Sequence, residues 1–328
     1  EDVTLTGENI AVSTADSTPI SGAVKYRTNP NLLDNWFFGR PVNQRGQVEY
    51  TGSNIYCIDR FICYSLNVNI SNSCLKLSSA EYWYSRIGQK IEPNLLNALS
   101  GKQVTMTALL KSAKAGQVKI SLYDSTDNIS SDTEKIETTT GDVQLVTTTF
   151  TIPPSYSNHK VEALFYSDYL KNGQETELYA LKLELGSTQT LAHKENGVWI
   201  LNEIPDYGEQ LRRCTYYAEK VESEDTPAIT NSTYVPSGAT SAVFILPYAR
   251  KRTVPAINFN DVSNYRIIAR SISGATTAFS VTAISPLDVG RTKAAILVSF
   301  NATDQVFYCF LQRSDNAPAG YAFISADL

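Results

Sequence analysis

The chain has 328 residues, a length that corresponds to about two domains of ordinary size. Hydrophobic residues make up 42% and charged residues 19%, which is typical of a globular protein and excludes an intrinsically disordered one. The net charge of -5 lacks the basic surplus of proteins that bind nucleic acids or anionic membranes, and no apolar run approaches the roughly 18 residues of a membrane-inserting helix.

Residues 1–29 are rich in Ser, Thr and Asp and show only weak alternation of polar and apolar side chains. They predict an extended connector. The sequence begins at Glu1 with no signal-like segment after it, so we expect a fragment or a processed product. Asn29-Pro30 is a turn signal, which places the start of the first domain at residue 30.

Residues 30–190 alternate between apolar and polar side chains with the period of a β-strand. The clearest example is 179–185, where leucines alternate with Lys182 and Glu184. Similar runs occupy 104–110, 118–122 and 146–152. Because no long helical pattern separates these runs, the segment predicts an all-β sandwich of antiparallel strands rather than an α/β domain.

Residues 191–231 predict a linker that contains one short amphipathic helix, at about 207–221. Asp206-Tyr207-Gly208-Glu209 has the spacing of a capping box at the start of this helix. Four residues then recur at intervals of three and four as a narrow apolar stripe, which is typical of an oligomerisation seam: Leu211, Cys214, Ala218 and Val221. We expect a homotrimer with this helix near the threefold axis; the alternative is that the stripe covers the edge of its own domain.

Residues 232–328 return to a period of two and predict a second, smaller β-sandwich or barrel, of which we favour the sandwich. The expected strands are 241–247, 254–260, 265–270, 277–284, 293–300, 305–311 and 320–326.

The cysteines form an odd, scattered set that makes a poor disulfide framework: Cys57, Cys63, Cys74, Cys214 and Cys309. We expect buried free thiols, with one bridge among the first three as the alternative. No CxxC spacing is present, which argues against zinc, and no cofactor is predicted.

One acidic loop offers oxygen ligands for calcium, from Asp124, Asp127, Asn128 and Asp132. It lacks the spacing of an EF-hand, so a polar hairpin loop is the favoured interpretation. No nucleophile elbow, HExxH motif or phosphate-binding loop occurs, so we predict no enzyme. If a glycosidase pair existed, Glu162, Asp168 and Glu184 would be the first candidates.

The aromatic residues are the most informative feature for function. Aromatic rings stack on the apolar faces of sugars, and charged neighbours fix the orientation of the sugar. Two clusters have this character, and the candidate glycan-binding residues are Tyr82, Trp83, Tyr84, Arg86, Tyr166, Asp168 and Tyr169. We expect at least one cluster to line an open groove; the alternative is that these rings fill the core or a subunit interface.

Three blocks stand out in chain order. The first, 31–61, reads NLLDNWFFGRPVNQRGQVEYTGSNIYCIDRF. The second is Leu181–Gly186 and the third is 206–217. Together they resemble a jelly-roll domain, similar to carbohydrate-binding modules, in tail and tail-fibre proteins of phages and prophages of gut Firmicutes, where the third block is similar to a YGEELxxCxRYY segment. One departure is Cys214-Thr215-Tyr216-Tyr217, which stands where the family usually reads CQRYY, so that an Arg is lost here.

The resemblance implies a virion tail-fibre protein that binds host cell-surface carbohydrate without catalysis, assembles with other virion tail proteins and is made in the bacterial cytoplasm. It implies a jelly roll in which a strand at 31–38 lies beside strand 179–186. Arg45 and the Asp59-Arg60 pair are expected as buried charged elements that pin loops. Two alternatives stay open: a polysaccharide depolymerase or glycoside hydrolase fragment, and a collar or baseplate protein that binds no glycan.

Overall fold

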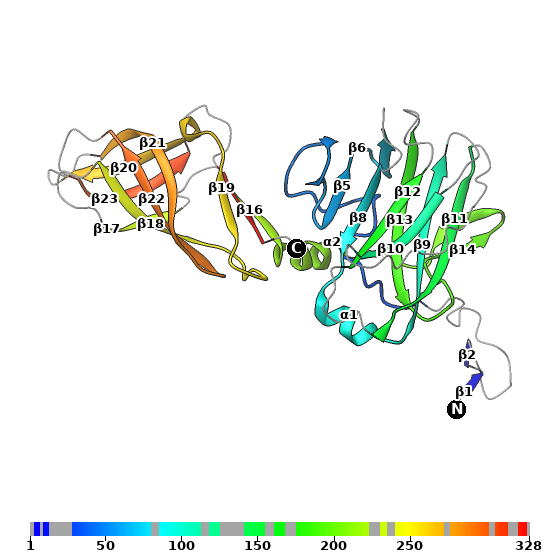
Figure 1. Ribbon diagram of the computed structural model, residues 1–328. Coiled ribbons are helices and arrows are strands. Elements are labelled where there is room, and N and C mark those ends of the chain that lie inside the picture. Colours follow the sequence, from blue (N-terminus) through cyan, green and yellow to red (C-terminus); the bar gives the residue numbers. More distant parts are fainter. Residues whose placement is uncertain are drawn as a thin grey trace. The chain divides into compact units, whose positions relative to one another are not determined.

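The structure, a computed structural model, describes most of the chain (Figure 1). The described residues are 3–6, 9–12, 28–79, 85–112, 118–124, 141–154, 161–167, 175–222, 230–234, 240–271, 276–301, 306–313 and 321–326. The chain divides into two compact units, Glu1–Gln210 and Leu211–Leu328. The division falls inside the segment that the sequence predicts as a linker.

The first unit contains two antiparallel sheets. One has the strand order β10 (Val118–Asp124), β12 (Val161–Ser167), β8 (Arg86–Lys90), β5 (Phe61–Tyr64) and β4 (Ile55–Tyr56). The other has the order β11 (Val143–Thr151), β9 (Gln103–Ser112), β13 (Thr176–Leu185), β7 (Leu75–Ser78), β6 (Leu66–Ile70) and β3 (Glu49–Gly52). Apolar side chains from both sheets form one core, which confirms the predicted all-β sandwich.

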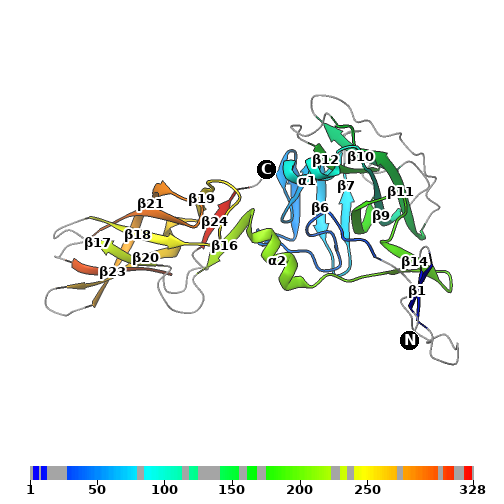
Figure 2. The same ribbon diagram turned by 90° about the horizontal axis from the view of Figure 1, so that it is seen from below.

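Helix α1 (Pro93–Leu99) closes one end of this sandwich (Figures 1 and 2). Its side chains Leu96 and Leu99 are buried in the core. Near the N-terminus, β1 (Val3–Thr6) and β2 (Asn9–Val12) pair as a separate antiparallel hairpin, where the sequence predicts only an extended connector.

Segment 31–38 lies beside β13, as expected, but it is not a regular strand. Leu32 N donates to Leu183 O at 2.8 Å, and Phe38 N donates to Tyr179 O at 2.9 Å. Between these contacts, Asn35 has a φ of 56°. This left-handed conformation interrupts the extended backbone that a strand requires, so the segment makes a single β-bridge, from Phe37 to Ala180.

The outer face of β13 is covered by residues 186–204, which we call the covering segment. Lys182 and Glu184 point to this face, and both are fully buried. Lys182 Nζ donates to Thr190 Oγ1 at 3.0 Å and to Glu203 Oε1 at 3.3 Å, while Glu184 Oε1 accepts from Thr190 N at 2.7 Å. The two buried charges therefore hold the covering segment on the sheet.

The covering segment contains a hairpin of β14 (Ala192–Glu195) and β15 (Val198–Leu201). Its turn is Asn196-Gly197, with φ values of 50° and 85°, which is the pair of positive angles that a tight two-residue hairpin needs. Trp199 packs against the core of the first unit.

The second unit is also all-β. Six strands close into a barrel, the alternative to the favoured sandwich, in the order β17 (Thr230–Tyr234), β18 (Ser241–Pro247), β22 (Lys293–Phe300), β21 (Thr276–Val289), β20 (Tyr265–Ser271) and β23 (Val306–Arg313). A further sheet consists of β16 (Ala218–Glu222), β24 (Tyr321–Ser325) and β19 (Ala256–Phe259). The 3-10 turn η3 (Val262–Asn264) precedes β20. Each of the seven strands expected after residue 240 overlaps an observed strand.

Helix α2 runs from Tyr207 to Thr215, so the predicted helix is wrong beyond Thr215. Asp206 Oδ1 accepts from Glu209 N at 2.8 Å, as the capping-box spacing predicts. Ala218 and Val221 instead belong to β16, where they pair with Ser325 and Ala322 of β24. The backbone pairing with β24 outweighs the apolar spacing that favours a longer helix.

The expected oligomerisation stripe is therefore not continuous. Leu211 and Cys214 lie on α2, while Ala218 and Val221 lie on a strand. Cys214 and Ala218 are already buried within one chain, and Leu211 is half-buried. Among the described residues, no helix is long and apolar enough to cross a membrane.

Candidate functional site

A row of aromatic and charged side chains crosses the outer face of the five-stranded sheet. The register pairs Tyr64 of β5 with Arg86 of β8, and Arg86 with Tyr166 of β12. Neighbouring residues on these strands, such as Ile87 and Phe165, point into the core and are fully buried. Since side chains alternate along a strand, Tyr64, Arg86 and Tyr166 share the opposite face. We call these three residues the aromatic row.

Arg86 lies among three aromatic rings. Its Cζ atom is 4.3 Å from the ring centroid of Tyr64, 5.8 Å from that of Tyr166 and 5.9 Å from that of Tyr123, which lies on β10 beyond β12. At these distances the ring faces attract the guanidinium cation. Burial raises the pKa of Tyr166 although the charge of Arg86 acts in the opposite direction, so the phenol is neutral at physiological pH.

Tyr64 also reaches across β8 to Glu162 on β12. Its hydroxyl lies 2.9 Å from Oε1 and 2.8 Å from Oε2 of Glu162. Burial, together with the charge of Glu162, raises the pKa of Tyr64 well above its usual range, so the hydroxyl donates throughout the physiological pH range. The contact orients a carboxylate on the same face as Arg86, where its remaining lone pairs can accept hydrogen bonds from a ligand.

The edge of this face is anchored by buried charges. Arg45 lies over the ring of Tyr56 at 5.1 Å and pairs with Asp59 at 2.8 Å. Arg60 pairs with Asp34 at 3.1 Å and also donates to the carbonyl of Lys90. The expectation that Arg45, Asp59 and Arg60 pin loops is confirmed.

The sequence identified part of this site. Arg86 and Tyr166 belong to the aromatic row, and the other five candidate residues lie outside the described residues: Tyr82, Trp83, Tyr84, Asp168 and Tyr169. Residues 80–84 come directly before Ser85, and residues 168–174 come directly after Ser167, so both predicted clusters adjoin the row in the chain. Tyr64 and Tyr123 were missed as ligand-binding candidates because only the strand register brings them to Arg86.

The carboxylates do not form the suggested glycosidase pair from Glu162 and Glu184. Glu162 is on the outer face of the five-stranded sheet, and Glu184 is on the outer face of the other sheet, under the covering segment. They therefore cannot flank one glycosidic bond. Asp168 lies outside the described residues.

Metal and thiol candidates add no further site among the described residues. No group of three or more His, Cys, Asp or Glu residues is placed to hold a metal ion there. In the calcium candidate loop, Asp127, Asn128 and Asp132 lie outside the described residues, as does the side chain of Asp124. Four cysteines are buried free thiols, as expected: Cys57, Cys63, Cys74 and Cys214.

Comparisons with known proteins give distant structural likenesses. No family model and no curated protein matches the chain. It is similar to the CBM22-1 xylan-binding domain of Paenibacillus barcinonensis Xyn10C, with 9% identity and a TM-score of 0.33 over 50% of this chain and 99% of that one. It is similar to the CBM22-1-CBM22-2 tandem of the same protein, with 10% identity and a TM-score of 0.33 over 92% of this chain and 99% of that one.

A third likeness is to the enzymatically active domain of bacteriophage CBA120 tailspike protein 4. It has 12% identity and a TM-score of 0.31 over 47% of this chain and 21% of that one. The fold and the site described above rest on the strand pairing and side-chain contacts of this chain itself.

Proposed function

We propose that the first unit binds a carbohydrate chain along the aromatic row and does not cleave it. The observation that carries this proposal is the register that aligns Tyr64, Arg86 and Tyr166 on three adjacent strands. Neighbouring strands are about 4.8 Å apart, so a row across three strands spans roughly 10 Å, comparable to two linked sugar rings.

The chemistry of the row suits a sugar chain. Tyrosine rings offer apolar faces for the C–H faces of pyranose rings. Arg86 and Glu162 supply a hydrogen-bond donor and an acceptor that distinguish hydroxyl positions. Both are held by neighbours within the sheet, Arg86 by aromatic rings and Glu162 by Tyr64, so little side-chain freedom is lost on binding.

At the level of the whole protein, we propose a phage tail-fibre protein that displays this unit toward host cell-surface glycans. It would act as a homotrimer in the virion, joined to other tail proteins. The resemblance of three sequence blocks to tail-fibre proteins supports this role. In the fold these blocks contact one another, because Leu32 N donates to Leu183 O at 2.8 Å and Asn35 N donates to Gln210 Oε1 at 2.6 Å.

The test is binding of the full chain to intact bacterial cells and to polysaccharides purified from them, with release of reducing ends measured in parallel. Saturable binding without release supports the proposal. Release of reducing ends would identify a depolymerase, and an absence of binding to every strain and polysaccharide tested would favour a collar or baseplate protein.

A further inference from the structure

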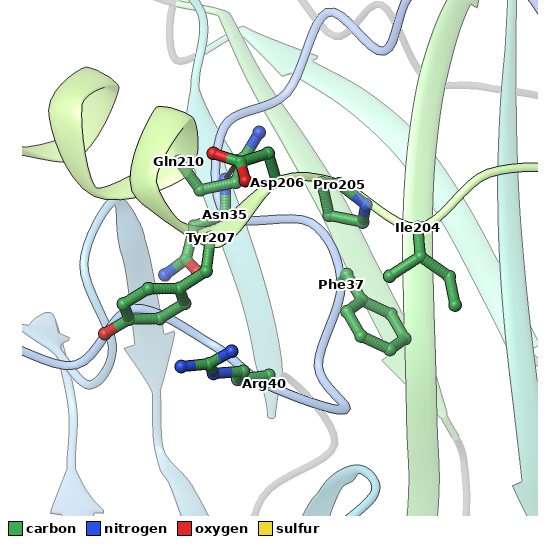
Figure 3. A pocket seen from close by; sticks show the side chains of 8 residues that line it. All are labelled: Asn35, Phe37, Arg40, Ile204, Pro205, Asp206, Tyr207 and Gln210. Carbon is green, nitrogen blue, oxygen red and sulfur yellow. Dashed lines mark hydrogen bonds between the residues drawn. The ribbon is translucent and has the colours of Figure 1, made fainter.

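A pocket lies within the first unit, and none of the residues that line it belongs to the aromatic row (Figure 3). Its volume is about 260 Å³. Segment 31–40 contributes Asn35, Phe37 and Arg40, while Pro205 precedes α2 and Tyr207 is its first residue. Pockets for drug-sized ligands are usually about 300–1,000 Å³, so this one fits a single small ring rather than a chain.

Arg40 is the cationic group of the pocket. Its Cζ atom lies 4.3 Å from the ring centroid of Tyr207, so the ring covers one face of the guanidinium and leaves its edge donors accessible. Arg40 is exposed, and no carboxylate pairs with it in the part of the chain that the structure describes. A planar guanidinium with accessible donors matches the two oxygens of a carboxylate.

The ring of Phe37 forms an aromatic wall of the pocket and lies over a glycine. Phe37 folds back over Gly39 so closely that a Cβ atom at residue 39 would lie 2.5 Å from the Cζ atom of Phe37. Trp36 meets the Phe37 ring edge to face at 6.3 Å. In Figure 3 the rings of Phe37 and Tyr207 lie on either side of Arg40.

The pocket is formed before a ligand binds. Asn35 N donates to Gln210 Oε1 at 2.6 Å, which joins two segments that are far apart in the sequence. The side chain of Asn35 also donates to the carbonyls of Val42 and Asp59, at 2.9 and 2.8 Å. Asp206 at the rim uses Oδ1 to accept from Glu209 N, so this carboxylate oxygen already has a donor within α2.

We infer that this pocket binds one carboxylate-bearing sugar residue of an acidic glycan. The sugar carboxylate pairs with the edge of the Arg40 guanidinium, and the sugar ring lies against Phe37 and Tyr207. The inference rests on the proposed carbohydrate binding and adds a second, anion-selective contact, so that an acidic polysaccharide engages both the aromatic row and the pocket.

The experiment is calorimetric titration of the full chain with glucuronate, with methyl glucoside as the neutral control ligand. We expect glucuronate to bind and methyl glucoside not to bind. Arg40→Gln should weaken glucuronate binding by about tenfold or more, because a charge-assisted pair is lost. Lys102→Gln, which removes an exposed positive charge elsewhere in the same unit, should have no effect.

A Tyr166→Ala variant separates this inference from the proposed function. It should retain glucuronate binding while losing affinity for polysaccharide on the aromatic row. If glucuronate binding survives in Arg40→Gln and is lost in Tyr166→Ala, the pocket inference is wrong and the row is the anion site. The pocket inference would also be overturned if the wild type did not bind glucuronate, or if it bound glucose 1-phosphate as tightly as glucuronate. Neither result would affect the proposed binding of polysaccharide at the aromatic row.

Discussion

Tyr64 and Glu162 form a hydrogen bond across an intervening strand, over a position that carries no side chain. Gly88 of β8 pairs with Ile62 of β5 on one side and with Leu164 of β12 on the other. It therefore lies between the tyrosine and the carboxylate on the outer face of the sheet. Because it is a glycine, no side chain of residue 88 stands between Tyr64 and Glu162, and the side chain of Leu164 packs over this position instead.

Replacement of Gly88 by Ala tests how closely β8 packs against β12 at this position. The added Cβ atom would lie 2.3 Å from Cδ2 of Leu164 and 2.9 Å from the carbonyl oxygen of Ala163, which is backbone and cannot rotate away. We expect a loss of about 1–3 kcal/mol in the free energy of unfolding, measured by urea denaturation. A Gly88→Ala protein as stable as the wild type would show that the sheet adjusts at no cost.

Alkaline pH should destabilise the fold through its tyrosines. Burial raises the pKa of Tyr50 to about 12 and raises that of Tyr64 further. In the unfolded chain tyrosine titrates near 10. The resulting stabilisation is fully present below about pH 10 and is lost as the pH rises toward the folded-state values.

The measurement is the free energy of unfolding at pH 9 and pH 11, with phenolate ionisation followed by ultraviolet absorbance. Tyr64→Phe should reduce the difference between the free energies of unfolding measured at pH 9 and at pH 11. It should also lower stability at neutral pH by about 1 kcal/mol, because the hydrogen bond to Glu162 is lost. The interpretation fails if all tyrosines ionise near pH 10 in the folded protein.

Strands β9, β10, β11 and β13 of the first unit and the seven strands expected after residue 240 could be predicted from the sequence, because their apolar and polar side chains alternate with a period of two. The sequence pattern was less reliable where tertiary contacts decide the structure. Lys182 and Glu184 have the pattern of solvent-facing residues, yet the covering segment buries them. The end of α2 depends on the pairing of β16 with β24, which no local pattern encodes.

The candidate site was predictable only in part for a related reason. Arg86 and Tyr166 were identified from nearby aromatic residues in the sequence. Tyr64 is more than twenty positions from Arg86, and only the antiparallel register of β5 and β8 brings the two together. Sequence neighbours do not reveal which strands pair, so this member of the row required the structure.

Lys182→Met should be strongly destabilising. Lys182 has no exposed surface, and its removal leaves the buried carboxylate of Glu184 with fewer positive neighbours. We expect a loss of about 3–5 kcal/mol in the free energy of unfolding, as is usual when one member of a buried ion pair is removed. The exposed Lys102→Met change is the control. Equal stability of the two variants would show that the covering segment is not held by this pair.

The proposed homotrimer predicts a mass of three 36.2 kDa chains by light scattering. Leu211 is the half-buried apolar residue of the expected seam on α2, so Leu211→Asp should dissociate the trimer while leaving the β-sheet circular dichroism nearly unchanged. A wild-type protein that is monomeric at micromolar concentration would contradict the trimer.

The aromatic row is tested most directly by the affinity of the full chain for the cell-surface polysaccharide of the bacterial strain to which it binds best. We predict that Tyr166→Ala weakens this affinity by about tenfold, and that Trp83→Ala, three positions before Arg86 in the sequence, does the same. Both variants should unfold at the same urea concentration as the wild type. Lys102→Gln should bind as the wild type does. Unchanged affinity in a folded Tyr166→Ala protein, or no polysaccharide binding by the wild type, would contradict carbohydrate recognition by the row.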